Sequence, residues 1–267
     1  MDELIICIAP YPSERQTEKL PEKIDLVQEV IDCYNAGASL VHLHVRDPKG
    51  SQVVDPKWFK SDIDKIHKIC PIIVEGSTGG MPEHTLEQRC VSFTVSGVEM
   101  GSLNLGSINM YGGVFCNKIS DVYFYARELK KRKLVPFIDI FDLSHFSCLK
   151  RLQKDKLLFP PYTIAFVFDY PDTLPYQDKY LELYLSEIPN KSNWFLTRYQ
   201  AKGADFFRRA IEMGGHVRVG YEDGPFLSNG QRGSNVELVA EVVRLAKEVG
   251  RTIANPNKAR KIMGIKK

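Results

Sequence analysis

Two histidines at alternate positions of one short apolar run are the residues best suited to chemistry in this sequence. His42 and His44 lie in "LVHLHVRDPKG" at residues 40–50, where Arg46 and Asp47 open a loop. Side chains alternate along a β-strand, so both imidazoles face one side, and in an apolar strand that side is inward. This spacing indicates either a metal site or a pair of hydrogen-bonded core histidines.

A second group of such residues lies near the C-terminus, in "HVRVGYED" at residues 216–223. A strand here puts His216, Arg218 and Glu222 on one face and ends on Asp223. Two imidazoles and one carboxylate with an open fourth position form a typical catalytic zinc set, so Glu222 suits the histidine pair. An arginine beside acids forms a structural ion pair or binds a substrate carboxylate, and Asp223 is a candidate general base.

Strand-like and helix-like segments alternate eight times along the chain, without a long linker or a low-complexity segment. The β-branched runs predict strands at residues 4–10, 39–45, 71–78, 97–106, 134–142, 162–169, 193–199 and 216–223. The apolar periodicity between them predicts helices near residues 21–38, 56–69, 82–91, 118–132, 145–157, 177–188, 204–214 and 234–250. Eight such units favour a closed (β/α)8 TIM barrel, with an open doubly wound sheet as the alternative.

Unusual residues concentrate in the loops that follow the expected strands. In a closed barrel these loops lie at the C-terminal mouth, where barrel enzymes hold their active sites. The last strand then borders the first, so Glu222 can reach histidines two strands away. Ser102 and Asn104 are polar on the inward side of a strand, which favours ligand contact. "GSTGG" at 76–80 is either a tight turn or an anion-binding loop, and Glu14 is either solvated or a ligand contact.

The composition narrows the class of protein. The 267 residues carry 36 basic and 33 acidic side chains, and the net charge of +3 gives no reason to expect nucleic acid. No apolar stretch approaches the ~20 residues of a membrane helix, and the N-terminus lacks a secretion-signal pattern. Six separated cysteines without a C-x-x-C pair favour a reducing compartment. We therefore expect one domain over residues 1–267, in the cytoplasm.

The motifs "HLHVRDPKG", "STGG", "SLNLGSIN", "FDLSH" and "GGHVRVGYEDG" occur in this order. With them the chain resembles the β-keto acid cleavage enzymes, whose best-known type is the 3-keto-5-aminohexanoate cleavage enzyme. The resemblance covers nearly the whole chain. It implies a zinc-dependent (β/α)8 enzyme that condenses a β-keto acid with acetyl-CoA, releases acetoacetate and leaves the other fragment as a CoA thioester.

The resemblance also implies roles for individual residues. The zinc ligands would be His42, His44 and Glu222. Zinc would polarise the keto oxygen and an acid–base pair would assist proton removal, so that an enolate attacks the thioester. That pair would be Arg218 and Asp223. The substrate contacts would be Glu14, Ser77, Gly80 and Ser102, with Asn104 as a neighbour.

The chain departs from the family's usual pattern in three segments. Acidic residues usually occupy a "PE-x-E" strand, where this chain has Phe137 and Asp139, and the usual glycine-bearing segments are replaced by "FVFDYPDTLPY" and "LTRYQAKGADF". Glu14 and Asp139 favour a cationic substrate side chain, whereas Phe137 favours an apolar one.

Three functions stay open at this point. They are the CoA-dependent cleavage enzyme, a zinc hydrolase or aldolase-type barrel that does not use CoA, and a protein that binds a metabolite without turnover. Barrels of this kind usually associate, so we expect a homodimer or homotetramer.

Overall fold

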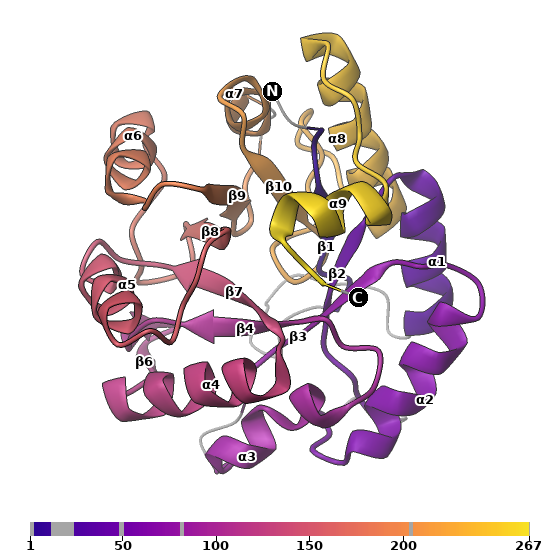
Figure 1. Ribbon diagram of the computed structural model, residues 1–267. Coiled ribbons are helices and arrows are strands. Elements are labelled where there is room, and N and C mark those ends of the chain that lie inside the picture. Colours follow the sequence, from indigo (N-terminus) through magenta and orange to yellow (C-terminus); the bar gives the residue numbers. More distant parts are fainter. Residues whose placement is uncertain (1–2, 12–23, 48–50, 81–82, 203–204, 267) are drawn as a thin grey trace.

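Eight parallel strands close into a barrel, and helices surround it (Figure 1). The computed structural model describes residues 3–11, 24–47, 51–80, 83–202 and 205–266. The closed sheet confirms the predicted TIM barrel and excludes the open sheet.

The barrel strands are β1 (Ile6–Ile8), β2 (Leu40–Leu43), β3 (Ile73–Gly76), β4 (Met100–Asn104), β7 (Val135–Ile140), β8 (Tyr162–Phe168), β9 (Ser192–Arg198) and β10 (His216–Val219). They run in the spatial order β1-β10-β9-β8-β7-β4-β3-β2, and β1 closes the ring by pairing with both β2 and β10. Because parallel neighbours need a crossover connection, a helical segment lies between most successive strands.

The helices are α1 (Leu26–Ala36), α2 (Pro56–His67), α3 (Leu86–Arg89), the 3-10 helix η1 (Val91–Thr94), α4 (Ile119–Arg132), α5 (His145–Lys154), α6 (Asp178–Glu187), α7 (Asp205–Glu212), α8 (Asn235–Val249) and α9 (Pro256–Met263). Several of them begin and end at residues suited to those positions. Asp55 caps α2 and is followed by proline, and Ser234 forms a capping box with Glu237 at the start of α8. Gly250 ends α8 in the left-handed conformation.

Strand alternation divides the core into two layers. Ile6 and Ile8 point outward from β1 and pack among the residues of α1, α2 and α8, whereas Cys7 points inward. The barrel interior is filled by side chains such as Leu40 and Phe137, so it is a packed core and not a pore. The same alternation turns His42 inward while its neighbours on β2 face the helices.

Two elements differ from the sequence prediction. The segment after β4, expected as a loop, forms an antiparallel hairpin of β5 (Ile108–Met110) and β6 (Gly113–Phe115). The last strand, expected to reach residue 223, ends at Val219, because Gly220 turns the chain with a positive φ of 139°.

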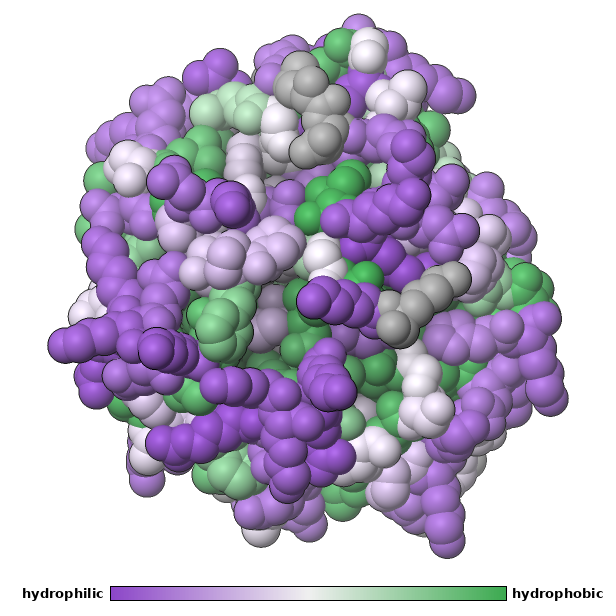
Figure 2. All heavy atoms as spheres, in the orientation of Figure 1, coloured by the Kyte–Doolittle hydropathy of each residue, from purple (hydrophilic) through white to green (hydrophobic). Residues whose placement is uncertain are grey.

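Helix α9 lies across the near end of the barrel in Figure 1 and was not predicted. Met263 and Ala259 pack into the barrel-interior cluster, and Asn193 at the start of β9 donates to the carbonyl of Ile262. Hydrophilic residues dominate the rim of this face (Figure 2). Among the described residues, no helix has the length and apolar character needed to cross a bilayer.

Candidate active site

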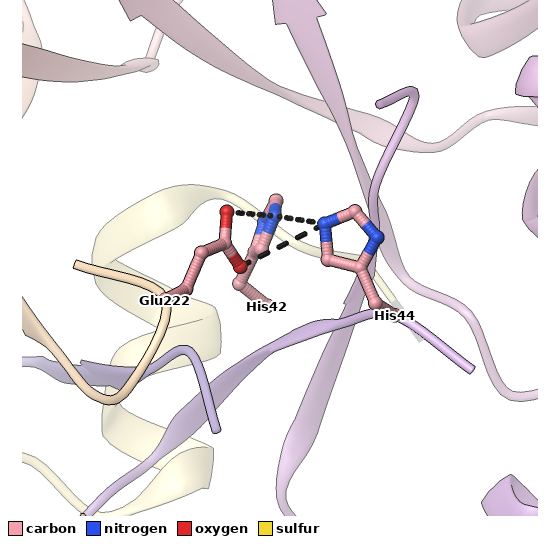
Figure 3. Close-up of side chains that lie close together, drawn as sticks. All are labelled: His42, His44 and Glu222. Carbon is pink, nitrogen blue, oxygen red and sulfur yellow. Dashed lines mark hydrogen bonds and ion pairs between the residues drawn. The ribbon is translucent and has the colours of Figure 1, made fainter. Parts of the chain in front are cut away.

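His42, His44 and Glu222 converge at the C-terminal mouth of the barrel (Figure 3). The Nε2 atoms of the two histidines are 3.3 Å apart. Glu222 Oε1 lies 3.5 Å from His42 Nε2, and Glu222 Oε2 lies 3.7 Å from His44 Nε2. The structure therefore brings together the three side chains that the sequence pattern singled out.

The donor set of these three residues suits a divalent cation. Glu75 accepts a hydrogen bond from His42 Nδ1, so the ring keeps its lone pair on Nε2, which faces His44. Glu222 Oε2 is buried and accepts no hydrogen bond from any described residue. Lone pairs this close repel one another unless a positive charge lies between them. Two imidazoles and a carboxylate match the ligand preference of zinc and similar ions.

Glu75 is a functional residue that the sequence reasoning missed. It lies on β3 directly opposite His42 in the strand register and is fully buried. A carboxylate bonded to the far nitrogen of a metal-binding imidazole fixes both its tautomer and its orientation. A signal was available in "PIIVEGST", because an acidic residue among aliphatic ones near a strand end has to find a partner.

The two histidines differ in basicity for identifiable reasons. Burial lowers the pKa of His42, but the carboxylates of Glu75 and Glu222 outweigh it and raise that pKa above its usual value. Burial dominates at His44, where Glu222 opposes it only partly and the pKa falls to about 4. His44 is therefore a neutral imidazole at neutral pH, the form that binds a metal.

Arg218 holds two carboxylates beside the histidines. Its Nη2 atom donates to Glu222 Oε1 at 2.8 Å and to Asp223 Oδ1 at 3.0 Å, and its Nε donates to Asp223 Oδ2 at 2.9 Å. Both Arg218 and Asp223 are almost fully buried. The arrangement ties the candidate metal ligand and the candidate base to one guanidinium.

A tight turn after β10 makes this double contact possible. Gly220 and Gly224 form an antiparallel bridge, and a Cβ atom at Gly220 would lie 2.2 Å from the carbonyl oxygen of Ala9. The backbone N–H of Glu222 donates to the same oxygen at 3.2 Å. Because the chain folds back here, consecutive acids both reach Arg218, which a continued strand would not allow.

The two neighbouring carboxyl groups have opposite pKa shifts. Burial raises the pKa of Glu222, but Arg218 and the two histidines outweigh it and lower the pKa to about 2. Burial raises the pKa of Asp223, and Arg218 offsets only part of that rise. Neighbouring acids whose pKa values diverge in this way are typical of acid–base sites, so Glu222 and Asp223 remain candidates for such a site.

The comparison with known proteins agrees with this geometry. Residues 3–265 match the family model described as beta-keto acid cleavage enzyme. The chain belongs to this family. The 3-keto-5-aminohexanoate cleavage enzyme of Acetoanaerobium sticklandii is 34% identical over 274 residues, with 100% of both chains covered. The 3-oxoadipate:acetyl-CoA acetyltransferase of Cupriavidus necator is 29% identical, with 95% of this chain and 91% of the relative covered.

The fold of this family member is similar to that of a solved protein. The apo structure of ObcA superposes with a TM-score of 0.72 at 18% identity, over 90% of this chain and 64% of the ObcA chain. At this identity the likeness concerns the barrel fold alone.

Other candidate residues of this cleavage-family member form a polar patch at the ends of β3 and β4. The backbone N–H of Thr78 donates to Ser102 Oγ at 2.6 Å, and Asn104 Nδ2 donates to Thr78 Oγ1 at 3.4 Å. Ser77 Oγ accepts from the N–H of Gly79 at 2.9 Å. Ser77, Ser102 and Asn104 therefore lie in one continuous patch, in which Thr78 is a member that the sequence reasoning missed.

Gly79 connects the patch to the histidines, and Gly80 lies farther along the same loop. A Cβ atom at Gly79 would lie 3.1 Å from His44 Cε1, so the loop passes directly beside the imidazole. A Cβ atom at Gly80 would lie 2.7 Å from Arg89 Cγ, which places Gly80 against Arg89. Glu14 falls outside the described residues.

Tyr170 is another residue that the sequence reasoning missed. Its hydroxyl donates to Asp223 Oδ1 at 2.9 Å, so Asp223 is held from one side by Arg218 and from the other by a tyrosine on the loop after β8. The two residues are 53 positions apart, and no local pattern links them.

The acidic pattern of the family is altered on β7. Phe137 is fully buried and packs on Phe195, with ring centroids 5.1 Å apart. Asp139 is buried, and its Oδ1 atom has no hydrogen-bond partner among the described residues. Burial raises the pKa of Asp139 to about 7, although Arg218 opposes the rise.

Proposed function

We propose that this protein condenses a β-keto acid with acetyl-CoA, forming acetoacetate and the CoA thioester of the remaining acyl group. The observation that carries the proposal is the convergence of His42, His44 and Glu222 directly beside the Arg218–Asp223 pair. Family membership and a relative named as an acetyl-CoA acetyltransferase support the same reaction class.

His42, His44 and Glu222 would hold one divalent ion, which we propose to be zinc. Such an ion supplies Lewis acidity toward a keto oxygen when bound. The buried Glu222 Oε2 without a partner and the facing Nε2 atoms support this ligand set. Glu75 orients the His42 ring from behind.

Asp223 would accept a proton from the carbon between the ketone and the carboxylate of the substrate. Burial raises the pKa of Asp223, which makes it a better proton acceptor than an ordinary aspartate, and Arg218 holds it in place. The resulting carbanion attacks the thioester carbonyl and expels CoA as a thiolate. The thiolate then attacks the original keto carbon, the carbon–carbon bond to the former α-carbon breaks, and Asp223 returns its proton to that carbon.

The polar patch on β3 and β4 would bind the carboxylate of the β-keto acid. Ser77, Ser102 and Asn104 supply hydroxyl and amide groups there, and we assign Gly80 a substrate contact from its place in the adjoining loop. We also assign Glu14 a substrate contact, from its place in the sequence.

We further propose that residues 1–267 form one barrel domain that works in the cytoplasm as a homodimer or homotetramer. All six cysteines are free thiols, which suits a reducing compartment. Sedimentation analysis tests the oligomeric state.

The decisive experiment for the function combines metal analysis with product detection. Purified protein is incubated with acetyl-CoA and a panel of β-keto acids, and acetoacetate and new acyl-CoA are measured by mass spectrometry. We expect about one zinc per chain and equal amounts of the two products. Cleavage of a keto acid in the absence of acetyl-CoA would instead support a zinc hydrolase or aldolase. Bound metabolite without any turnover would support a binding protein.

A further inference from the structure

One side of the barrel mouth is built from aromatic side chains. We define the aromatic wall as Tyr111, Phe141, Tyr170 and Tyr199. They lie in β5–β6 and immediately after β7, β8 and β9, at the same end of the barrel as the histidines. Tyr170 and Tyr199 stack with ring centroids 4.5 Å apart, and the Tyr111 ring meets both edge-on at 6.2 and 5.8 Å. Phe141 meets Tyr170 edge-on at 6.1 Å.

The aromatic wall directly adjoins the proposed acid–base pair. The Tyr170 hydroxyl donates to Asp223, which accepts from Arg218 at the same time. Phe141, Tyr170 and Tyr199 each keep 7–8% of their surface exposed, while most barrel-interior residues are fully enclosed. The wall therefore forms the boundary between the packed core and the site.

The backbone around the wall is held in strained conformations. Tyr111 and Gln200 have positive φ angles of 54° and 50°, and Asp169 and Asp172 on either side of Tyr170 have 67° and 68°. Such conformations are uncommon in residues other than glycine, and they cluster where side chains are positioned for function. The N–H groups of Tyr111 and Gly112 donate to Pro171 O and Asp172 Oδ2, which fixes the hairpin to the loop after β8.

The rest of the mouth is polar, so a bound substrate would meet polar groups on one side and the aromatic wall on the other. Around the ring, β10, β2, β3 and β4 carry the histidines, the Arg218 cluster and the serine patch, while β7, β8 and β9 carry the wall. A β-keto acid has two polar groups, the ketone and the carboxylate, and one variable substituent. Because the polar strands accommodate the first two, the substituent is left to face the wall.

We propose that the aromatic wall is the subsite for the substituent of the β-keto acid, and that the preferred substrate carries an uncharged apolar group there, aromatic or branched. This inference rests on the proposed function. Stacked rings 4.5 Å apart leave no room for a cation between their faces, since a cation binds within about 6 Å of each centroid from an open face. Two of the nearby carboxylates are already engaged, Asp223 with Arg218 and Asp169 with Arg198. The third, Asp139 on β7, is buried and has one oxygen without a partner among the described residues, so the cationic compound in the test below probes it directly.

The test measures kcat/KM for four β-keto acids with acetyl-CoA. 3-Oxo-5-phenylpentanoate is apolar, 3-keto-5-aminohexanoate cationic, 3-oxoadipate anionic, and 3-oxopentanoate is the short reference. We expect the phenyl compound to exceed the reference about tenfold, because added apolar contact in a pocket is worth that much. It should exceed both charged compounds by more.

Substitutions in the aromatic wall then test whether the wall causes this substrate preference. Phe141→Ala and Tyr199→Ala should each lower the ratio of phenyl compound to reference about tenfold. Phe146→Ala is the matched control, since Phe146 is also a buried aromatic residue but lies in the layer between barrel and helices, so the ratio should stay unchanged.

Each other outcome has a definite meaning. A preference for a charged substrate, or a ratio unaffected by both wall variants in folded protein, overturns the inference alone. A higher KM for acetyl-CoA with an unchanged ratio would assign the wall to the cosubstrate and also overturn it. Absence of acetoacetate with every compound overturns the proposed function, and the inference falls with it.

Discussion

The two sides of the barrel mouth are lined by different kinds of side chain. On β10, β2 and β3, each buried charge has a partner of opposite sign or a hydrogen-bond donor, as in the pairs His42–Glu75 and Arg218–Asp223. On β7, β8 and β9, aromatic rings line most of the mouth and pack mainly on one another, with Asp139 as a buried carboxyl among these strands. If both proposals hold, the first side carries out the chemistry and the second selects the substrate.

The comparison also shows where the two sides depend on each other. Among the described residues, one hydrogen bond joins the aromatic wall to Asp223, and the Tyr170 hydroxyl donates it. Changes on the polar side should therefore alter metal content or kcat, whereas changes on the aromatic side should alter substrate preference, with Tyr170 as the exception.

The largest effect is expected for Glu222→Gln. The amide keeps the shape but loses the charge of a proposed ligand, so metal content should fall and turnover drop at least about a thousandfold. Metal analysis and the acetoacetate assay check both. The matched control is Glu99→Gln, because Glu99 also pairs with an arginine, Arg260, but away from the mouth. Normal zinc and turnover in Glu222→Gln would refute the ligand assignment.

Asp223→Asn should have the next largest effect. Removing the proposed base lowers kcat by about 10²–10⁴-fold, while metal content stays normal. The control is Asp169→Asn, which alters another arginine-paired aspartate, with Arg198, on the aromatic side. It should cause a far smaller loss of kcat. Equal losses in the two variants would show that Asp223 has a structural role only.

Much of this architecture could be predicted from the sequence, because the spacing of apolar residues shows which segments are strands and helices and which side chains are buried. The barrel followed from eight repeated units, and the meeting of His42, His44 and Glu222 followed from strand alternation together with closure. His44 and Glu222 are 178 positions apart in the sequence. Closure of the barrel brings them into contact, because a single strand, β1, lies between β2 and β10.

Other features depended on information that a periodic pattern does not contain. The turn at Gly220 arises from a close approach to Ala9, and the Tyr170–Asp223 bond joins two loops. Helix α9 was overlooked although its signals are present: an asparagine cap followed by proline at the start, and Gly264 in the left-handed conformation at the end.

Glu75→Gln should weaken metal binding without removing a ligand. The amide oxygen can still accept from His42 Nδ1, but the charge that steadies the imidazole is lost, so metal affinity should fall about 10–100-fold. Competition with a chelator measures this. Asp139→Asn is the control, since Asp139 is also a buried interior carboxyl but its side chain makes no hydrogen bond to a histidine among the described residues. Equal chelator sensitivity of both variants would contradict the role of Glu75.

Tyr170→Phe should have a smaller effect on turnover and none on substrate preference. The ring remains in the wall, while Asp223 loses one hydrogen bond, so kcat should fall about tenfold. The ratio of phenyl compound to short reference should stay near that of the unaltered protein. A changed ratio with normal kcat would mean that the hydroxyl contacts substrate and not Asp223.

The smallest effect on activity, and a distinct effect on stability, is expected for His216→Asn. His216 lies in the barrel interior on β10, where its Nδ1 accepts from the N–H of Ile5, and burial, together with Arg251, lowers its pKa to about 3. Its shift is thus opposite to that of His42, which has carboxylates beside it. At neutral pH both variant and parent should turn over substrate alike.

The pH dependence of unfolding should distinguish His216 from His42, the proposed metal ligand. Between its unfolded pKa of about 6.5 and the folded value of about 3, the unfolded chain binds a proton that the folded chain does not. Stability should therefore fall as the pH drops through this window, by up to about 1.4 kcal/mol per pH unit from His216 alone. In His216→Asn the amide oxygen can accept the Ile5 N–H without titrating, so denaturant unfolding should show a shallower fall. Identical slopes in the two proteins would mean that His216 is protonated in the folded barrel, and that the contrast between the two buried histidines is wrong.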